Sequence, residues 1–538
     1  MTERYLVYPL VLVALGQLIG LWRTDARWYA AQIGQRLVIL SVAVCALIFP
    51  GGEPLTSAAW LLFAVFAGGP RWLLALSTRQ RQAGNWARAA HWEDLAGRLI
   101  MGQLGQLHRQ HAQALRHLAW DETDEAEALL VRLAADSLPS AARGLVNLWR
   151  LMLLAEQRAW ARVVTGFEEV DDWGTLWFAT RARLLAARAY AETGAMLRAL
   201  RCAQMVVLSP AVVRLGQGYW QLRVRLAAMA GDAGELEYLL GQRPLWRSGF
   251  QQLAAYWRGR CALALGDRGG AIKLLTRAYA LTHPRDRGWR EALRHHLARA
   301  EASAPAVLPP AHWPGYTEAL AAVRHAEEQA APWRALMQFS LPAPATLIVL
   351  GEIALVFIAW TTLPADWEDR VIAVAGNGAV TIRLNEWWRL VTTLFLHATW
   401  LHLGLNGLAL WMFGSAVERA YGWVRWLVIF FLGGALGNLL SAALARYELA
   451  IGASAGVFAL LGAYTVAVSR LRTPPYAGLR PRLLGMLLML IAADFLIGWR
   501  EPQVDNLAHI GGFVAGIILG LLVNCIHGRS RLQIAPTK

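Results

Sequence analysis

Apolar residues gather in two blocks of this chain, residues 4–76 and 345–526, and a polar stretch of roughly 260 residues separates them. A helix needs about 20 consecutive apolar residues to cross a bilayer. The hydrophobic fraction of the chain is 56%, and only 17% of its residues are charged. These features predict an all-α fold, in which a polytopic membrane protein carries a soluble insert.

The first block is predicted to form an N-terminal membrane segment, residues 1–80, of about three helices. It contains three apolar runs, and a turn rich in Pro and Gly separates the last two: Tyr5 to Trp22, Leu37 to Phe49 and Ala58 to Leu76. The first run also fits a cleaved signal peptide with a small-residue site at Ala14-Leu15-Gly16. We favour an uncleaved helix, because the apolar run continues past that site and Arg4 is the only basic residue before the run. The second run is short for a span, so the choice between two and three spans stays open.

Arginines at the ends of these runs predict the orientation of the chain through the positive-inside rule. Arg23, Arg27 and Arg36 mark the first connection as cytoplasmic, and a second cluster marks the start of the polar stretch as cytoplasmic too: Arg71, Arg79, Arg81 and Arg88. Three spans satisfy both conditions with the N-terminus outside.

The polar stretch, residues 81–335, is predicted to be a cytoplasmic α-helical domain. Its turn signals contain Gly194, Gly231 and Gly266, which are 37 and 35 residues apart, and helical stretches lie on both sides of each turn. This pattern resembles tetratricopeptide-type helix pairs, which stack to bury their apolar faces. An irregular α-helical domain is the alternative, and in both cases we expect a surface that binds a protein partner. Residues 304–314, rich in Pro and Ala, are the expected linker out of this domain.

The second block lies within residues 336–528, and its six apolar segments predict a bundle of six membrane helices. The arginines between the fourth and fifth segments, and the basic tail at residues 529–538, mark both of these connections as cytoplasmic. The segments cover approximately residues 344–361, 394–416, 424–445, 452–469, 483–499 and 506–526.

Three of these segments enter from the outer face and carry polar residues within their first two turns. His402 and Asn406 open the second segment, Ser454 the fourth and His509 the sixth. At a rise of 1.5 Å per residue, each lies about 5 to 10 Å below the outer end of its helix. Polar groups at this depth are costly and tend to face a bundle interior or a wet cavity. We therefore expect the four side chains to share one cavity that opens to the outside.

Ser454 and His509 together predict acyl transfer to serine, followed by hydrolysis. A serine hydroxyl is a poor nucleophile until an adjacent base takes its proton, and histidine is the usual base. The oxyanion formed on the attacked carbonyl needs donors, which His402, Asn406 and the backbone N–H of Ser454 can supply. A Ser–His dyad is expected, with a triad as the alternative, because no acidic residue is clearly placed beside His509 among the three nearby in sequence: Asp494, Glu501 and Asp505.

A ladder of small residues offers a reason for the serine and the histidine to meet. His509, Gly512 and Gly516 share one face of the sixth segment, and Gly520 extends the series. Such small-xxx-small ladders let two membrane helices approach closely. If the fourth segment packs there, Ser454 comes within reach of His509.

Each of these residues also has a structural alternative. Ser454 between small residues can serve helix packing, and His509 can bond a backbone carbonyl. His402 and Asn406, four residues apart on one face, can clamp two helices together. Together these residues indicate a catalytic site more specifically than any one of them does, because all of them belong to one longer sequence pattern.

That pattern resembles the rhomboid family of intramembrane serine proteases over about residues 340–527. The matching motifs are Glu386-Trp387-Trp388-Arg389-Leu390 with His397, His402-Leu403-Gly404-Leu405-Asn406 with Gly414 and Glu418, Gly452-Ala453-Ser454 with Phe458 and Gly462, and Asn506-Leu507-Ala508-His509-Ile510-Gly511-Gly512 with Gly516. The resemblance implies a six-helix rhomboid-type bundle with the activity of a serine-type intramembrane endopeptidase.

The resemblance also implies a role for each matching position. Ser454 matches the nucleophile and His509 its base, and two further positions match the oxyanion-stabilising pair: His402 and Asn406. Phe458 is expected to orient His509 by packing on its ring. Ala455 replaces a glycine of many family members, and we expect its methyl group to leave activity intact. Supporting positions are Trp388, Arg389, Gly452, Phe458, Gly512 and Gly516.

The implied substrates are transmembrane proteins within the lipid bilayer, cut near the outer membrane boundary where a helix unwinds readily. No cofactor and no metal are implied, and the expected location is the bacterial inner (plasma) membrane. The alternative function is a catalytically silent rhomboid-fold scaffold that binds clients through its helical domain; the intact Ser454 and His509 argue against it. A solute transporter is disfavoured, because no inverted repeat is evident.

Charge and cysteine content exclude two further classes. The net charge of +15 comes from dispersed arginines, which argues against a nucleic-acid partner. The cysteines have no CxxC spacing, so neither a disulfide framework nor a zinc site is expected from them: Cys45, Cys202, Cys261 and Cys525.

Overall fold

A computed structural model describes residues 30–48, 53–209, 211, 216–241, 248–283, 287–302, 310–337, 343–362, 365–444, 449–471, 476–500 and 504–523. Throughout these ranges the regular structure is helical, and one isolated antiparallel bridge joins Asn377 to Ala450. The chain divides into two compact units, Met1–His325 and Ala326–Lys538. The predicted membrane helix at Tyr5 to Trp22 lies outside the described residues.

The helices of the first unit, followed by the helix that crosses the boundary between the units, are α2 (Ala30–Ile48), α3 (Glu53–Phe63), η2 (Ala64–Gly68), α4 (Gly69–Gln82), α5 (Trp86–Leu99), α6 (Gly102–Ala119), α7 (Thr123–Ala135), α8 (Ser140–Glu156), α9 (Trp160–Glu168), α10 (Leu176–Glu192), α11 (Met196–Val207), α12 (Gly216–Ala230), α13 (Ala233–Gly241), α14 (Ser248–Ala264), α15 (Arg268–Leu281), α16 (Arg287–Ala302) and α17 (Tyr316–Met337).

The third predicted apolar run belongs to a helix that is longer than the run itself. The helices α3, η2 and α4 join into one continuous helix, Pro54–Gln82, of 29 residues with a mean hydropathy of 1.5. Pro70 has no N–H to donate, and the helix passes it through a π-turn, in which the Gly69 N–H bonds to the Ala64 carbonyl. This helix is long and apolar enough to cross a membrane.

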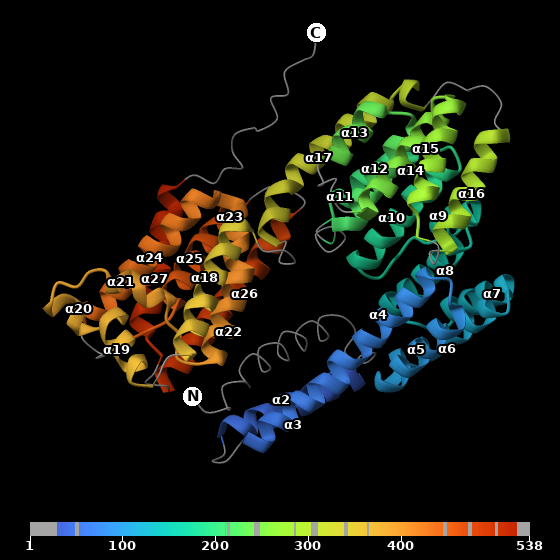
Figure 1. Ribbon diagram of the computed structural model, residues 1–538. Coiled ribbons are helices and arrows are strands. Elements are labelled where there is room, and N and C mark those ends of the chain that lie inside the picture. Colours follow the sequence, from blue (N-terminus) through green and yellow to red (C-terminus); the bar gives the residue numbers. More distant parts are fainter. Residues whose placement is uncertain are drawn as a thin grey trace, which may run out of the picture. The chain divides into compact units, whose positions relative to one another are not determined.

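Helix hairpins follow one another through the rest of the first unit, as Figure 1 shows. Each hairpin turns at a residue with positive φ, and these residues are 35 to 37 positions apart: Gly84, Asp121, Arg158, Gly194, Gly231 and Gly266. A left-handed residue at this place ends the first helix and frees the chain to reverse. The first helices of successive hairpins, α8, α10, α12 and α14, pack on their neighbours. The helical content predicted for residues 81–335 is therefore confirmed, whereas the likeness to tetratricopeptide repeats stays a prediction.

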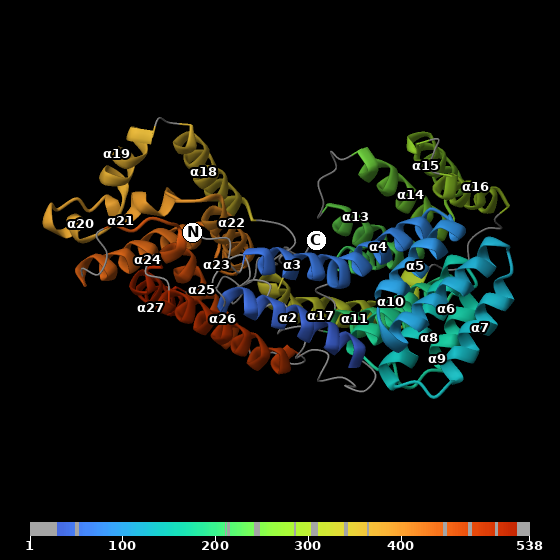
Figure 2. The ribbon, with the colours of Figure 1, turned by 90° about the horizontal axis from the view of Figure 1, so that it is seen from below.

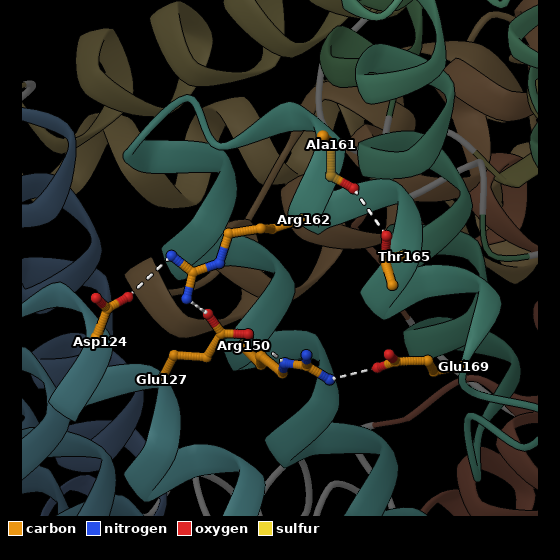
Figure 3. A network of polar contacts seen from close by, with 7 residues as sticks. All are labelled: Asp124, Glu127, Arg150, Ala161, Arg162, Thr165 and Glu169. Carbon is orange, nitrogen blue, oxygen red and sulfur yellow. Dashed lines mark hydrogen bonds and ion pairs between the residues drawn. The ribbon is translucent and has the colours of Figure 1, made fainter.

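An ion-pair network joins two neighbouring hairpins (Figure 3). The buried carboxylate of Glu127 on α7 accepts a hydrogen bond of 2.8 Å from Arg150 Nε on α8, and it also pairs with Arg162 on α9. Arg162 reaches Asp124 at 3.0 Å, and Arg150 reaches Glu169 at 3.0 Å. Because both arginines share one carboxylate, the three helices are held by a network with little freedom.

A second buried cluster lies between α5, α6 and α8. Glu93 Oε1 is 2.7 Å from His108 Nδ1 and 3.0 Å from His111 Nδ1, and the ring of His111 stacks on Trp149 with centroids 4.1 Å apart. Burial alone would raise the pKa of Glu93, but the two imidazoles outweigh it and hold this pKa well below its usual range. Burial lowers the pKa of His111.

We expect acid to destabilise this unit at a mild pH. An exposed histidine in the unfolded chain takes up a proton near pH 6.5, whereas buried His111 resists it, so the unfolded state binds more protons as the pH falls through 6.5. The free energy of unfolding should fall by about 1 kcal/mol between pH 7.5 and 5.5. The contribution of Glu93 is lost only at lower pH, because its folded pKa lies below its unfolded one.

The measurement is thermal unfolding of the purified chain at both pH values, followed by circular dichroism. His111→Phe keeps an aromatic ring against Trp149 and should remove most of the pH dependence. An equal pH dependence in the two proteins would contradict the assignment to His111.

The helices of the second unit are α18 (Pro344–Thr361), α19 (Ala365–Ala375), α20 (Ala379–Arg383), α21 (Arg389–Thr392), α22 (Trp400–Ala409), η6 (Leu410–Gly414), α23 (Ser415–Tyr421), α24 (Trp423–Ala443), α25 (Ser454–Arg470), α26 (Arg480–Arg500) and α27 (Asn506–Leu522), with short 3₁₀ turns η5 (Thr393–Phe395) and η7 (Tyr476–Leu479).

Each of the six predicted apolar segments contains a helix of this unit. The helix in the second segment begins at Trp400 and not at residue 394, because Thr393–Phe395 form a 3₁₀ turn. By length and hydropathy, α18 and α24 qualify as membrane spans, and α25 and α27 are shorter apolar helices. With Pro54–Gln82, three helices qualify among the described residues, and the six-span arrangement stays a prediction.

Glycines bring α24, α25 and α27 into close contact, and Figures 1 and 2 show these helices side by side. A Cβ added at Gly512 would lie 2.3 Å from the Ala455 carbonyl oxygen, and one at Gly516 would lie 1.9 Å from that of Ala459. The ladder of α27 therefore packs on α25, as the sequence predicts. The opposite face of α27 exposes large apolar side chains, as a lipid-facing surface does: Ile510, Val514 and Ile518.

A buried carboxylate caps the N-terminal end of α18. Glu418 on α23, 6% exposed, accepts hydrogen bonds of 3.0 and 2.7 Å from the backbone N–H groups of Ala345 and Thr346, and one of 2.8 Å from Thr346 Oγ1. The first N–H groups of a helix have no partner within it, and a negative charge there is favourable. Glu418 therefore fastens α18 to α23.

Removing this carboxylate should destabilise the second unit. Glu418→Ala leaves three donors unsatisfied, and we expect a loss of about 3 kcal/mol in the free energy of unfolding. Thermal unfolding in detergent measures the effect, with Glu352→Ala on the exposed side of α18 as the matched control. If both variants unfold at the same temperature, Glu418 does not anchor this helix.

Candidate active site

Ser454 is the first residue of α25, and the segment before it is tightly held. Gly452 donates its backbone N–H to the Thr393 carbonyl at 3.0 Å, and Thr393 Oγ1 donates to the Ala450 carbonyl at 2.7 Å. Ala450 also pairs with Asn377 through the isolated bridge. These bonds fix the position at which the chain enters the helix and so the position of the Ser454 side chain.

Gly452 has a backbone that only glycine adopts readily, since its φ is +137°. A Cβ at this position would lie 2.8 Å from His402 Nε2 and 3.8 Å from Ser454 Oγ. The His402 imidazole and the Ser454 hydroxyl therefore line the same space beside Gly452, although their residues are far apart in the sequence.

His402 and Asn406 project from one face of α22, as their spacing predicts. The helix begins where Thr399 Oγ1 accepts the backbone N–H of His402 at 3.1 Å. Asn406 is 9% exposed, and its Nδ2 donates to the His402 carbonyl at 3.2 Å. One N–H of the amide is thus used within the helix, and the second remains to serve a ligand.

His397 is a further histidine of this site. Its side chain is 1% exposed, and its ring centroid is 4.9 Å from that of His402. The sequence motif contained His397, but spacing alone assigned it no role. A buried ring against His402 limits the positions that the His402 imidazole can take.

His509 lies in the first turn of α27. Asp505 begins this helix by accepting the Ala508 N–H on Oδ1 at 3.0 Å, and its Oδ2 accepts a hydrogen bond of 2.5 Å from Ser441. The His509 ring stacks on Phe458, with centroids 4.4 Å apart and planes 9° from parallel. Phe458 is one turn beyond Ser454, so the imidazole lies over the turn of α25 that begins with the serine.

The sequence named the acidic neighbour of His509 only as one of three candidates and did not single it out. Asp494 on α26 places its Oδ2 2.8 Å from His509 Nδ1. Of the two other acids considered, Asp505 caps α27 and Glu501 lies outside the described residues. One feature of the sequence could have identified Asp494, because it is the one charged residue in the apolar stretch 483–499.

Trp388 and Arg389 fasten the segment that precedes the site. The guanidinium of Arg389, 4% exposed, donates from Nη1 to the Gly376 carbonyl at 3.2 Å and also contacts the Ala373 carbonyl. Trp388 is half exposed, and its Nε1 donates to the Val374 carbonyl at 3.3 Å. Both side chains hold the end of α19, so they support the fold without reaching the serine.

The described residues contain no group of three or more His, Cys, Asp and Glu side chains arranged to hold a metal ion. What the site offers is a helix N-terminus with a hydroxyl, three imidazoles, an amide and a carboxylate. This set can move a proton between a hydroxyl and an imidazole and can donate hydrogen bonds to a developing negative charge.

Comparison with known families finds a rhomboid domain at residues 384–524. The chain is 32% identical over 199 residues to the Rhomboid protease GluP of Bacillus subtilis, covering 37% of this chain and 38% of that protein. It is 28% identical over 196 residues to the Putative rhomboid protease YdcA of the same organism, covering 34% of this chain and 91% of that protein. It is 36% identical over 175 residues to the Rhomboid-like protease 3 of Toxoplasma gondii, covering 32% of this chain and 66% of that protein.

The matches leave most of this chain outside them. The chain spans less than half of the length of the first of these relatives, and residues 1–383 lie outside the rhomboid domain. The C-terminal part of the chain thus carries a rhomboid domain, and the chain has apolar helices long enough to cross a membrane, as an integral membrane protein does.

Proposed function

We propose that this chain, with its rhomboid domain, is an intramembrane serine endopeptidase that cleaves transmembrane proteins near the outer membrane boundary. The observation that carries the proposal is the stack of His509 on Phe458, over the turn of α25 that begins with Ser454. The similarity to proteins named rhomboid proteases supports the same class of activity.

In this proposal Ser454 is the nucleophile and His509 its base. The imidazole takes the hydroxyl proton as Ser454 Oγ attacks the peptide carbonyl, and it then gives the proton to the leaving amine. The acyl group stays on the serine oxygen until water, activated by the same imidazole, hydrolyses the ester and restores the hydroxyl.

The oxyanion would form beside the start of α25. A helix leaves its first backbone N–H groups without internal partners, and its positive dipole end favours a negative charge. His402, the remaining N–H of Asn406 and the Ser454 backbone N–H are the proposed donors. The shared space beside Gly452 supports this placement, because it is lined by His402 and by Ser454.

The helical domain has a separate role in this proposal. Its hairpins form a cytoplasmic, tetratricopeptide-like surface that binds a protein partner, in a chain that resides in a bacterial inner membrane. The alternative of a silent scaffold is not favoured, since Ser454 and His509 are both present.

Reconstitution tests the proposal directly. Purified protein is mixed in proteoliposomes with a single-span substrate, and mass spectrometry locates the cleaved bond. A fluorophosphonate probe, which reacts with activated serines, should label Ser454 under the same conditions. The absence of both cleavage and labelling, in a protein that is folded by circular dichroism, would refute the enzymatic role.

A further inference from the structure

We propose that Asp494 is a positioning residue for His509, which turns the expected dyad into a three-membered chain of Asp494, His509 and Ser454. Its carboxylate accepts the Nδ1 proton of His509 and stabilises the imidazolium that forms when Ser454 is deprotonated. The inference rests on the proposed function of Ser454 and His509.

Two contacts restrict the orientation of the His509 imidazole. The stack on Phe458 sets the plane of the ring, with centroids 4.4 Å apart. The 2.8 Å contact between His509 Nδ1 and Asp494 Oδ2 sets the rotation of the ring within that plane. With Nδ1 turned toward α26, Nε2 points away from Asp494 and is free to take a proton from a hydroxyl.

The contact also selects the tautomer. An ionised carboxylate accepts hydrogen bonds and cannot donate, so the proton of neutral His509 resides on Nδ1 and the lone pair on Nε2. A base must offer this lone pair to the hydroxyl that it activates. Asp494 would therefore prepare His509 for the first step and balance the positive charge that the step creates.

Among the carboxylates near His509, Asp494 is the one that contacts the imidazole. The other carboxylate near the start of α27, that of Asp505, is engaged with the Ala508 N–H and with Ser441. A charged residue within an apolar membrane helix is costly and is retained where it has a partner and a task. The side chain of His509 is 8% exposed and that of Asp494 29% exposed, so the charge acts close to the ring but is partly screened.

A structural tie between α26 and α27 is the competing explanation, and Asp494→Asn separates the two. The amide keeps a hydrogen-bonding group near Nδ1, so a tie between helices should largely survive. It carries no charge, and its NH₂ group can donate to Nδ1 and favour the wrong tautomer. We expect kcat to fall about 10- to 100-fold while KM stays within about twofold, a smaller effect than at a fully buried triad because Asp494 is partly exposed.

The pH profile supplies a readout that a structural role would not move. The charged or titratable groups around His509 are Asp494 from α26, His402 from α22 and Asp505 at the start of α27 itself. Loss of the Asp494 charge should move the acidic limb of the fluorophosphonate labelling rate, because the carboxylate then no longer stabilises the imidazolium. Glu352→Gln, which removes a carboxylate from the exposed side of α18, should leave the limb where it is.

Each outcome bears on a different claim. If the wild-type protein labels and cleaves but Asp494→Asn retains its kcat and its pH profile, the positioning role is wrong and Asp494 only ties two helices. If Asp494→Asn raises KM alone, the role is also wrong. If the folded wild-type protein neither labels nor cleaves, the proposed function itself fails, and the inference with it.

Discussion

Ser454→Ala should reduce cleavage of a transmembrane substrate by at least about 10³-fold, because the variant retains no hydroxyl to form the acyl intermediate. His509→Ala should have an effect of similar size, since the serine then has no base. The double variant should be no worse than either single one, because the two groups act as one unit. Initial rates in proteoliposomes measure all three.

A second serine on the same helix provides the control. Ser469, near the other end of α25, bonds the Val466 carbonyl with its hydroxyl, and Ser469→Ala should cleave at the wild-type rate. Thermal unfolding of every variant separates loss of chemistry from loss of fold. Undiminished cleavage by folded Ser454→Ala would show that another group carries the reaction.

Among glycine-to-alanine substitutions in the second unit, Gly516→Ala should lower the free energy of unfolding most. An added Cβ would lie 1.9 Å from the Ala459 carbonyl oxygen, and backbone on both sides cannot yield as a side chain does. Separating α27 from α25 would cost about 3 kcal/mol in the free energy of unfolding. It would also move His509 away from the turn that begins with Ser454, so activity and stability should fall together.

Gly485→Ala on α26 is the matched control, because an added Cβ there meets no atom within 4 Å. Unfolding midpoints in detergent and labelling by the fluorophosphonate probe measure the two effects. Equal midpoints for the two variants would mean that α25 and α27 do not approach as closely as the structure has them.

Periodicity in the sequence located most helices, and its failures have physical causes. The pattern of Gly194, Gly231 and Gly266 predicted three turns of the first unit. The same spacing continues to Asp121 and Arg158, which also adopt a left-handed backbone. A search for glycine passes over such positions, because the turn is imposed there by the packing of the helices and not by local preference.

The candidate site, too, could be predicted from the sequence only in part. Order and spacing along the chain predicted the close packing through Gly512, whereas the roles of Ser454 and His509 stay predictions. They did not predict the contact of His509 with Asp494, because it depends on how α26 is rotated and placed beside α27. Sequence distance ranked Asp505 as high as Asp494, and only the three-dimensional arrangement assigns the first to a helix cap and the second to the imidazole.

The cap that Glu418 gives to α18 bears on how the chain is made. The carboxylate follows Thr346 by 72 residues, so α18 leaves the ribosome long before its partner is synthesised. At about 5 to 20 residues per second, the interval is on the order of 4 to 14 s. Throughout that time the first N–H groups of α18 must be satisfied by water or by lipid head groups. We therefore expect the start of this helix to stay at the membrane surface until α23 is made and Glu418 can accept these hydrogen bonds.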